Sequence, residues 1–104
     1  MLKEVAKIIE SLKLKPSDLR IYNLLLEKQE LSVKEIAKEL NLSTRFVRER
    51  LRDLHRRGII KRKLVERGWI GYVYRAEEPR VVINRIKIHL LSEFGKLEKV
   101  LESF

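Results

Sequence analysis

Residues 31–60 read LSVKEIAKELNLSTRFVRERLRDLHRRGII, and this stretch decides the fold. Ser32, followed three residues later by Glu35, has the form of a capping box, in which two side chains satisfy free backbone N–H groups at a helix start. Apolar residues at 33, 36, 37 and 40 then recur at helical spacing. Asn41 tolerates the left-handed conformation that ends a helix. We therefore expect a short helix that begins at residue 33.

A second helix is expected to start almost at once. Ser43 is its N-cap candidate, and Gly58 supplies its end, which places the helix over 44–57. The inward stripe is Val47, Leu51 and Leu54. The outward side carries Thr44, Arg45, Arg48, Glu49, Arg52, His55 and Arg56. Two helices joined by so short a turn are typical of a helix-turn-helix, in which the second helix is the recognition helix.

The charge of the chain is concentrated on this segment. Residues 45–63 contain nine Lys or Arg and two acids, and residues 43–80 carry twelve basic and five acidic side chains of a chain whose net charge is +9. Such crowding destabilises the fold through self-repulsion unless a polyanion neutralises it. An uneven positive charge of this kind indicates nucleic acid, and we expect double-stranded DNA as the partner.

The stretch after the helix pair predicts a β-hairpin. Residues 60 and 64 are apolar on one side of an alternating pattern, and Lys61, Lys63 and Val65 lie on the other. RGWIG at 67–71 holds two glycines and is the expected turn, and residues 72–76 are strong strand formers. A hairpin at 59–77 after a helix-turn-helix is a wing. The expected fold is therefore mainly α with a small β-hairpin, a winged helix-turn-helix whose core is 17–78.

Helices are expected on both sides of the hairpin and the helix pair. Residues 2–14 form an amphipathic helix, segment 1–15 of a single domain spanning 1–104. Ser17 is expected to cap the next helix, which runs to about Lys28 with the buried stripe Leu19, Tyr22, Leu25 and Leu26. Pro79 suits a helix start, and segment 80–104 keeps its apolar side chains on one face.

The last helix would extend about 35 Å, longer than a core of this size covers. Its apolar side chains would each contribute about 1.5 to 3 kcal/mol when fully buried. We therefore expect a homodimer in which the C-terminal helices pair and the first helix contributes. The expected interface residues are Leu2, Val5, Ile9, Leu12, Ile83, Ile86, Leu90, Phe94, Leu97, Leu101 and Phe104.

Several other classes of protein are disfavoured. The chain has no cysteine, and its two histidines, His55 and His89, have no nearby acidic cluster, so we expect no metal site. No phosphate-cradling loop or nucleophile with partners is present, and we expect neither enzyme activity nor a cofactor. The longest aliphatic runs are three residues, far short of a membrane span, which favours a cytoplasmic, nucleoid-associated protein. The 38% of charged residues is typical of thermophiles.

The stretch 31–60, together with GYVYRAEEP at 71–79, resembles the DNA-binding domain of the TrmB-like winged-helix transcription regulators of archaea and bacteria. MarR-like regulators are more distant. The resemblance covers 17–90 and implies that positions 43–48 and 52 face the major groove, with the wing along a minor groove or the phosphate backbone. Phe46 stands where such proteins often have a small polar residue, and we expect it to pack beneath the helix. TrmB-like proteins commonly carry a C-terminal sugar-binding effector domain, which we do not expect here; a small-molecule effector is unknown.

The candidate DNA contacts lie on the recognition helix and the wing. An Arg can grip guanine through two hydrogen bonds or hold a phosphate, and the sequence leaves this choice open for each Arg. The indole at the wing tip either packs on the hairpin or a partner subunit, or inserts against a sugar or base edge. The candidates are Ser43, Thr44, Arg45, Arg48, Arg52, Arg56, Lys61, Arg62, Lys63, Arg67 and Trp69.

Three functions fit the pattern. The leading prediction is sequence-specific DNA binding by a homodimeric transcription regulator. The first alternative is a chromatin-type protein that coats DNA with low specificity, which the ratio of specific to non-specific affinity would distinguish. The second is a protein-interaction winged helix in a transcription complex, which would bind free DNA weakly. The operator, the regulated genes and the sign of regulation cannot be read from the sequence.

Overall fold

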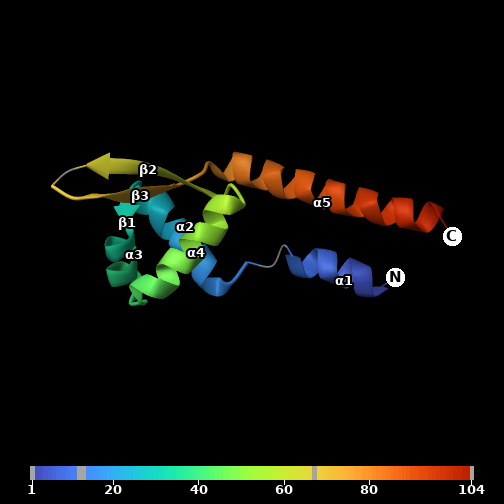
Figure 1. The fold of residues 1–104 in the computed structure, drawn as a ribbon, viewed down its shortest axis with the longest axis horizontal. Helices are drawn as coiled ribbons and strands as arrows, with labels where there is room; N and C mark the ends of the chain where they lie inside the picture. The colour runs from blue at the N-terminus through green and yellow to red at the C-terminus, as the bar shows by residue number, and fades with distance from the viewer. Residues whose placement is uncertain (1, 12–13, 67, 104) are drawn as a thin grey trace. The chain divides into compact units, whose positions relative to one another are not determined.

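A computed structural model describes residues 2–11, 14–66 and 68–103 (Figure 1). The predicted site residues Leu12, Arg67 and Phe104 lie outside these ranges. The chain forms two compact units, residues 15–78 and the two ends, 1–14 with 79–104. The elements in chain order are α1 (Leu2–Ser11), α2 (Pro16–Lys28), β1 (Leu31–Ser32), α3 (Val33–Leu40), α4 (Thr44–Arg56), β2 (Ile60–Glu66), β3 (Ile70–Ala76) and α5 (Pro79–Glu102).

The helices α3 and α4 begin where the sequence predicted, and α4 ends at Arg56, one residue before the predicted end. The N–H of Ser32 donates to Glu35 Oε1 over 3.0 Å, and the N–H of Glu35 donates to Ser32 Oγ over 3.2 Å. Asn41 adopts the left-handed conformation with φ 55°, which ends α3. Ser43 Oγ then accepts from the N–H of Phe46 over 3.1 Å and caps α4. Local side-chain chemistry therefore accounts for the abrupt restart between the two helices.

The start of α2 differs from the prediction. The helix begins at Pro16, and Ser17 is not its N-cap. Proline suits the first helical position because its φ is already helical and its missing N–H needs no partner there. The cap interaction comes instead from Asp18, whose Oδ2 accepts from the backbone N–H of Lys15 over 3.0 Å.

The buried stripe of α2 is also shifted. Asp18, Ile21 and Leu25 are buried, and Tyr22 is half-buried. The predicted members Leu19 and Leu26 are instead 52% and 44% exposed. Positions 18, 21 and 25 follow helical spacing, and an acid can occupy the first of them because a cation reaches it from α4, as described below.

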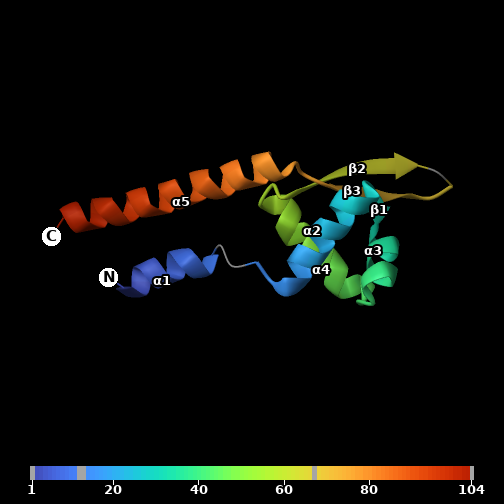
Figure 2. The ribbon, with the colours of Figure 1, turned by 180° about the vertical axis from the view of Figure 1, so that it is seen from behind.

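The predicted hairpin forms, and β1 adds a third strand. The antiparallel sheet has the order β1-β3-β2, with Leu31 opposite Tyr74 and with β2 and β3 paired from Ile60↔Ala76 to Glu66↔Ile70. The turn is shorter than predicted, because Ile70 and Gly71 already belong to β3. Within the unit 15–78 the tip of the hairpin projects past the helices in two opposite views (Figures 1 and 2). This hairpin, β2 and β3 with their turn, is the wing.

The core of the unit 15–78 joins all its helices to the sheet. Its most deeply buried apolar side chains are Ile21, Leu25, Ile36, Val47, Leu51, Leu54 and Ile60. The hydroxyl of Tyr22 donates to the carbonyl of Glu77 over 2.6 Å, which ties α2 to the chain just after β3. Burial raises the pKa of Tyr22, and the charge of Glu77 adds to the effect. The hydroxyl therefore stays protonated as a donor.

The second unit consists of α1 in contact with the long helix α5. The apolar stripe of α5 is divided: Ile86, Leu90 and Leu97 are half-buried, whereas Ile83, Phe94 and Leu101 are 66%, 38% and 50% exposed. On α1, Val5 is half-buried and Leu2 is 87% exposed. None of the helices in the described ranges is long and apolar enough to cross a membrane.

Candidate nucleic-acid interface

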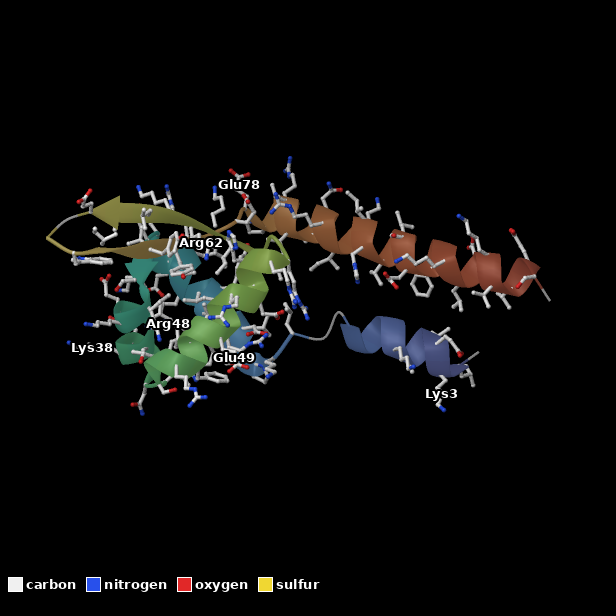
Figure 3. The ribbon with its side chains drawn as sticks, in the orientation of Figure 1. Lys3, Lys38, Arg48, Glu49, Arg62 and Glu78 are labelled. Atoms are coloured by element: carbon white, nitrogen blue, oxygen red, sulfur yellow. The ribbon has the colours of Figure 1, made fainter. Side chains whose placement is uncertain are left out.

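Three arginines form an exposed row on α4. Arg45, Arg48 and Arg52 are spaced by three and four residues, so they lie close to one face of the helix. Within the described ranges none of the three has an ion-pair partner. Figure 3 shows Arg48 projecting from α4. These guanidinium groups are therefore available to an external anion.

The first turn of α4 lies beside this row. Thr44 is exposed, whereas the hydroxyl of Ser43 is engaged as the helix cap. Phe46 is half-buried, and its packing beneath the helix stays a prediction. At this end a helix presents free N–H groups and a positive dipole, both of which favour a phosphate.

Arg50 belongs to the same helix but points inward. Its Nε donates to Asp18 Oδ1 over 2.7 Å and its Nη2 to Asp18 Oδ2 over 2.9 Å, a bidentate pair in which the Asp18 side chain is 1% exposed. Nη2 also donates to Asp53 Oδ2 over 2.8 Å. The hydrogen bonds with Asp18 raise the pKa of Arg50 against the opposing effect of burial. This pair fastens α4 to the start of α2.

Asp53 forms ion pairs with the arginines at the C-terminal end of α4. Its Oδ1 accepts from Arg56 Nη2 over 2.5 Å, and its Oδ2 lies 3.3 Å from Arg57 Nε. Burial alone would raise the pKa of Asp53, but the hydrogen bond from Arg56 and the charges of Arg57 and Arg50 lower it below its ordinary value. The predicted DNA contact Arg56, although 77% exposed, is therefore partly neutralised by its own helix.

The predicted cations of the wing also have partners. Lys61 Nζ lies 3.7 Å from Glu77 Oε1 and Lys63 Nζ lies 3.2 Å from Glu30 Oε1, and both lysine side chains are 55% exposed. The guanidinium of Arg62 lies 4.3 Å from the centre of the Tyr72 ring, a cation–π contact. Of these three, only Arg62 keeps a full charge that no carboxylate offsets.

Trp69 packs on its own hairpin. A Cβ placed on Gly71 would clash with Cζ3 of the Trp69 indole, so the ring covers the backbone of this glycine. Trp69 nevertheless remains 47% exposed. Of the two alternatives for Trp69, packing on the hairpin or insertion against DNA, the single chain shows the first. The exposed part of the ring can still contact a ligand.

The arrangement of these elements decides the fold. Residues 31–56 form two helices joined through a capped turn, and a β-hairpin follows with an additional short strand at its side. Residues 14–61 match a family model described as winged helix-turn-helix DNA-binding. The chain has the winged helix-turn-helix fold. The predicted fold is confirmed, whereas the TrmB-like subgroup stays a prediction.

Solved structures with this winged helix-turn-helix fold match most of the chain. One is a possible transcriptional regulator from Methanosarcina mazei (22% identity, TM-score 0.76, covering 96% of this chain and 88% of that one). Another is a protein of the archaeon Sulfolobus tokodaii (19% identity, TM-score 0.61, covering 95% and 92%). ZitR of Lactococcus lactis, solved in complex with DNA, matches with 21% identity and a TM-score of 0.57, covering 88% of this chain and 63% of ZitR. No curated protein sequence matches the chain.

The pair of Asp18 and Arg50 is the feature that sequence reasoning missed. Arg50 is one of the nine basic residues of 45–63 that the sequence assigns to the positive cluster. Its position held the missing signal, because residue 50 lies three after Val47 and four before Leu54, inside the apolar stripe. An Arg at such a position needs a buried acid, but nothing in the sequence indicated that the acid would be Asp18 of another helix.

Proposed function

We propose that the protein is a sequence-specific, double-stranded-DNA-binding transcription regulator. In this proposal α4 enters the major groove, and the wing lies on the phosphate backbone or in a minor groove. The observation that carries the proposal is the row of Arg45, Arg48 and Arg52, which is exposed and has no partner within the described ranges. The structure of ZitR with DNA gives support at the level of the fold.

Placement along α4 suggests a division of work among its residues. In helix-turn-helix proteins the N-terminal residues of the recognition helix contact base edges. Arg45 and Arg48 lie in the first and second turns and are assigned to bases, whereas Arg52 is assigned to phosphate. Arg62 on the wing is assigned to phosphate as well, because its stacking on Tyr72 holds the guanidinium in one place.

The proposal includes a homodimer formed by α5. Ile83, Phe94 and Leu101 are exposed in the single chain although they continue the stripe that is half-buried elsewhere on α5. A second copy would cover such side chains in a two-fold arrangement. A dimer would then present its α4 helices to successive major grooves about 34 Å apart and would select a roughly palindromic site.

The test of the function is selection of bound duplexes from random DNA, followed by affinity measurements at several salt concentrations. About four basic side chains per subunit on phosphates make about eight contacts in a dimer, so log K should fall against log salt with a slope near −7. A recovered palindromic consensus supports the proposal. A slope shallower than about −3, or no enrichment of any sequence, contradicts it.

Alanine variants separate base contacts from phosphate contacts. Arg45→Ala or Arg48→Ala should cost about 1 to 3 kcal/mol on the selected site and relax its base preference. Arg62→Ala should weaken all sequences about equally. If the two α4 variants also lose affinity equally on selected and random DNA, low-specificity DNA coating replaces the proposal.

The dimer is tested on the full chain by sedimentation equilibrium. Phe94→Asp with Leu101→Asp should convert the dimer to a monomer, since both side chains are exposed in the single chain and their replacement leaves its core intact. Ile88→Asp is the matched control, because Ile88 is 58% exposed but lies off the stripe. A wild-type monomer at micromolar concentration refutes the dimer.

A further inference from the structure

The two acids of α4 have opposite surroundings. Asp53 is bound by Arg50, Arg56 and Arg57, as described above. Glu49 is exposed and has no ion-pair partner within the described ranges, although α4 is rich in arginine. Figure 3 labels Glu49 and Arg48 on opposite sides of α4. The sequence therefore leaves one carboxylate free on a face that is otherwise positive.

Glu49 lies among the arginines assigned to DNA. At 3.6 residues per turn it is about 40° around the helix from Arg45 and about 60° from Arg52, one turn away from each. It is opposite the buried stripe formed by Val47, Leu51 and Leu54. A group at this position of a recognition helix points into the groove.

An acid at this position weakens non-specific binding. It repels phosphates and lowers the positive field that draws the helix to DNA. A pair with Arg45 would offset this cost, but the basic residue then precedes the acid by four, which is the weaker orientation for such a pair, and the pair is not formed. Glu49 thus has no stabilising partner that accounts for its place.

We infer that Glu49 determines specificity by accepting a hydrogen bond from the 4-amino group of a cytosine in the major groove. This inference rests on the proposed function. Carboxylates are acceptors only, and cytosine presents an amino donor at its major-groove edge, so an acid selects it over guanine and thymine, which present acceptors there. Arg45 and Arg52 on either side hold the carboxylate near the duplex by their own contacts.

Variants of Glu49 should move specific and non-specific affinity in opposite directions. Glu49→Ala should weaken binding to the selected site by about 5-fold or more and strengthen binding to random DNA by about two- to fivefold. Glu49→Gln should shift the preferred base at one position of each half-site from cytosine to adenine, since a glutamine amide matches adenine with two hydrogen bonds. Both changes should leave the fold intact, because the Glu49 side chain is exposed and forms no ion pair with any residue that the structure describes.

The experiment repeats duplex selection with the wild type, Glu49→Gln and the matched control Glu27→Gln, which makes the same charge change at an exposed position of α2. A second measurement uses the wild-type consensus with the contacted cytosine replaced by 2-pyrimidinone, which lacks the 4-amino group. The wild type should lose about 5-fold or more in affinity on this duplex, and Glu49→Ala should lose nothing further.

The outcomes separate this inference from the function on which it rests. If the wild type selects a consensus and Glu49→Gln selects the same one with an unchanged affinity ratio, the role of Glu49 is refuted and the function stands. Equal strengthening on all sequences would show that Glu49 is only a repulsive charge, which also refutes the inference. If the wild type enriches no sequence, both the function and the inference are refuted.

Discussion

Removing Arg50 should destabilise the protein more than removing its partner Asp18. Arg50→Ala deletes three hydrogen bonds of 2.7, 2.9 and 2.8 Å and leaves a carboxylate that is 1% exposed. Among the described residues, the N–H of Lys15 is then the one donor still bonded to that carboxylate. Breaking a buried pair from one side costs about 3 to 5 kcal/mol, and Arg50→Ala should fall in this range.

Asp18→Ala should cost less, about 2 to 3 kcal/mol. In this variant the guanidinium of Arg50 is still bonded to Asp53 and its side chain is 10% exposed, so the remaining charge is not stranded. The double variant Asp18→Leu with Arg50→Met should return to within about 1 kcal/mol of the wild type, because apolar side chains of similar volume replace both charges.

Urea unfolding at one fixed protein concentration measures these differences, since association contributes to apparent stability. Arg52→Ala is the control, and it should change stability by less than about 0.5 kcal/mol because the side chain is exposed and unpaired in the described ranges. A cost below about 1 kcal/mol for Arg50→Ala, or a larger cost for Asp18→Ala, would refute the reasoning from burial.

Four further variants test other features of the fold. The pKa of Asp53 is lowered in the fold, so the ionised carboxylate stabilises the protein above the ordinary pKa of 3.8, and this stabilisation is lost as the pH falls through the folded pKa. In urea unfolding, Asp53→Asn should therefore lose less stability between about pH 5 and pH 2 than the wild type. Gly71→Ala should displace the Trp69 ring and redden its fluorescence, whereas Gly95→Ala, whose Cβ meets no atom within 4 Å, should raise the melting temperature. Gln29→Gly should stabilise the chain by about 1 kcal/mol by relieving a residue at φ 73° and ψ −58°, and a lower urea midpoint would contradict this.

The helix pair could be predicted because its signals are local. The N-terminal boundaries of α3 and α4 are each set by a side chain within three residues, Ser32 with Glu35 for α3 and Ser43 with Phe46 for α4. Local pairs of this kind mark a helix start whatever the rest of the fold. The pattern of residues 60–65 predicted a strand, but its sidedness was wrong: Leu64, placed on the apolar side with Ile60, is 63% exposed, whereas Val65, placed with Lys61 and Lys63, is buried.

The packing of α2 could not be predicted, because its determinants are distant in sequence. A stripe containing Leu19 and Leu26 has helical spacing, as does the stripe that is buried in the structure. Asp18 can be buried because it pairs with Arg50, 32 residues away in the sequence. The third strand has the same character. The two residues of β1 acquire strand structure by pairing with β3 at Tyr74 and Val73; from the sequence, residues 30–32 fit either a turn or a two-residue strand.

Internal pairing changes the electrostatic argument for DNA binding. From the sequence, the nine basic residues of 45–63 appeared as one self-repelling cluster that needs a polyanion. In the structure, carboxylates partner Arg50, Arg56, Arg57, Lys61 and Lys63. The repulsion among these cations is therefore relieved without DNA, and the total charge of the segment is no longer the argument for DNA binding.

Support for DNA binding comes instead from where the unpaired positive charges lie. The carboxylates neutralise cations at the C-terminal end of α4 and at the base of the wing. They leave the charges of Arg45, Arg48 and Arg52 unpaired on the outward face of α4, within the described residues. Arg62 remains on the wing, held against Tyr72. A protein that only coats DNA gains from every exposed cation, because its affinity scales with the phosphates that it neutralises. A protein that reads sequence gains more from a few charges in fixed places, and this distribution favours the second kind.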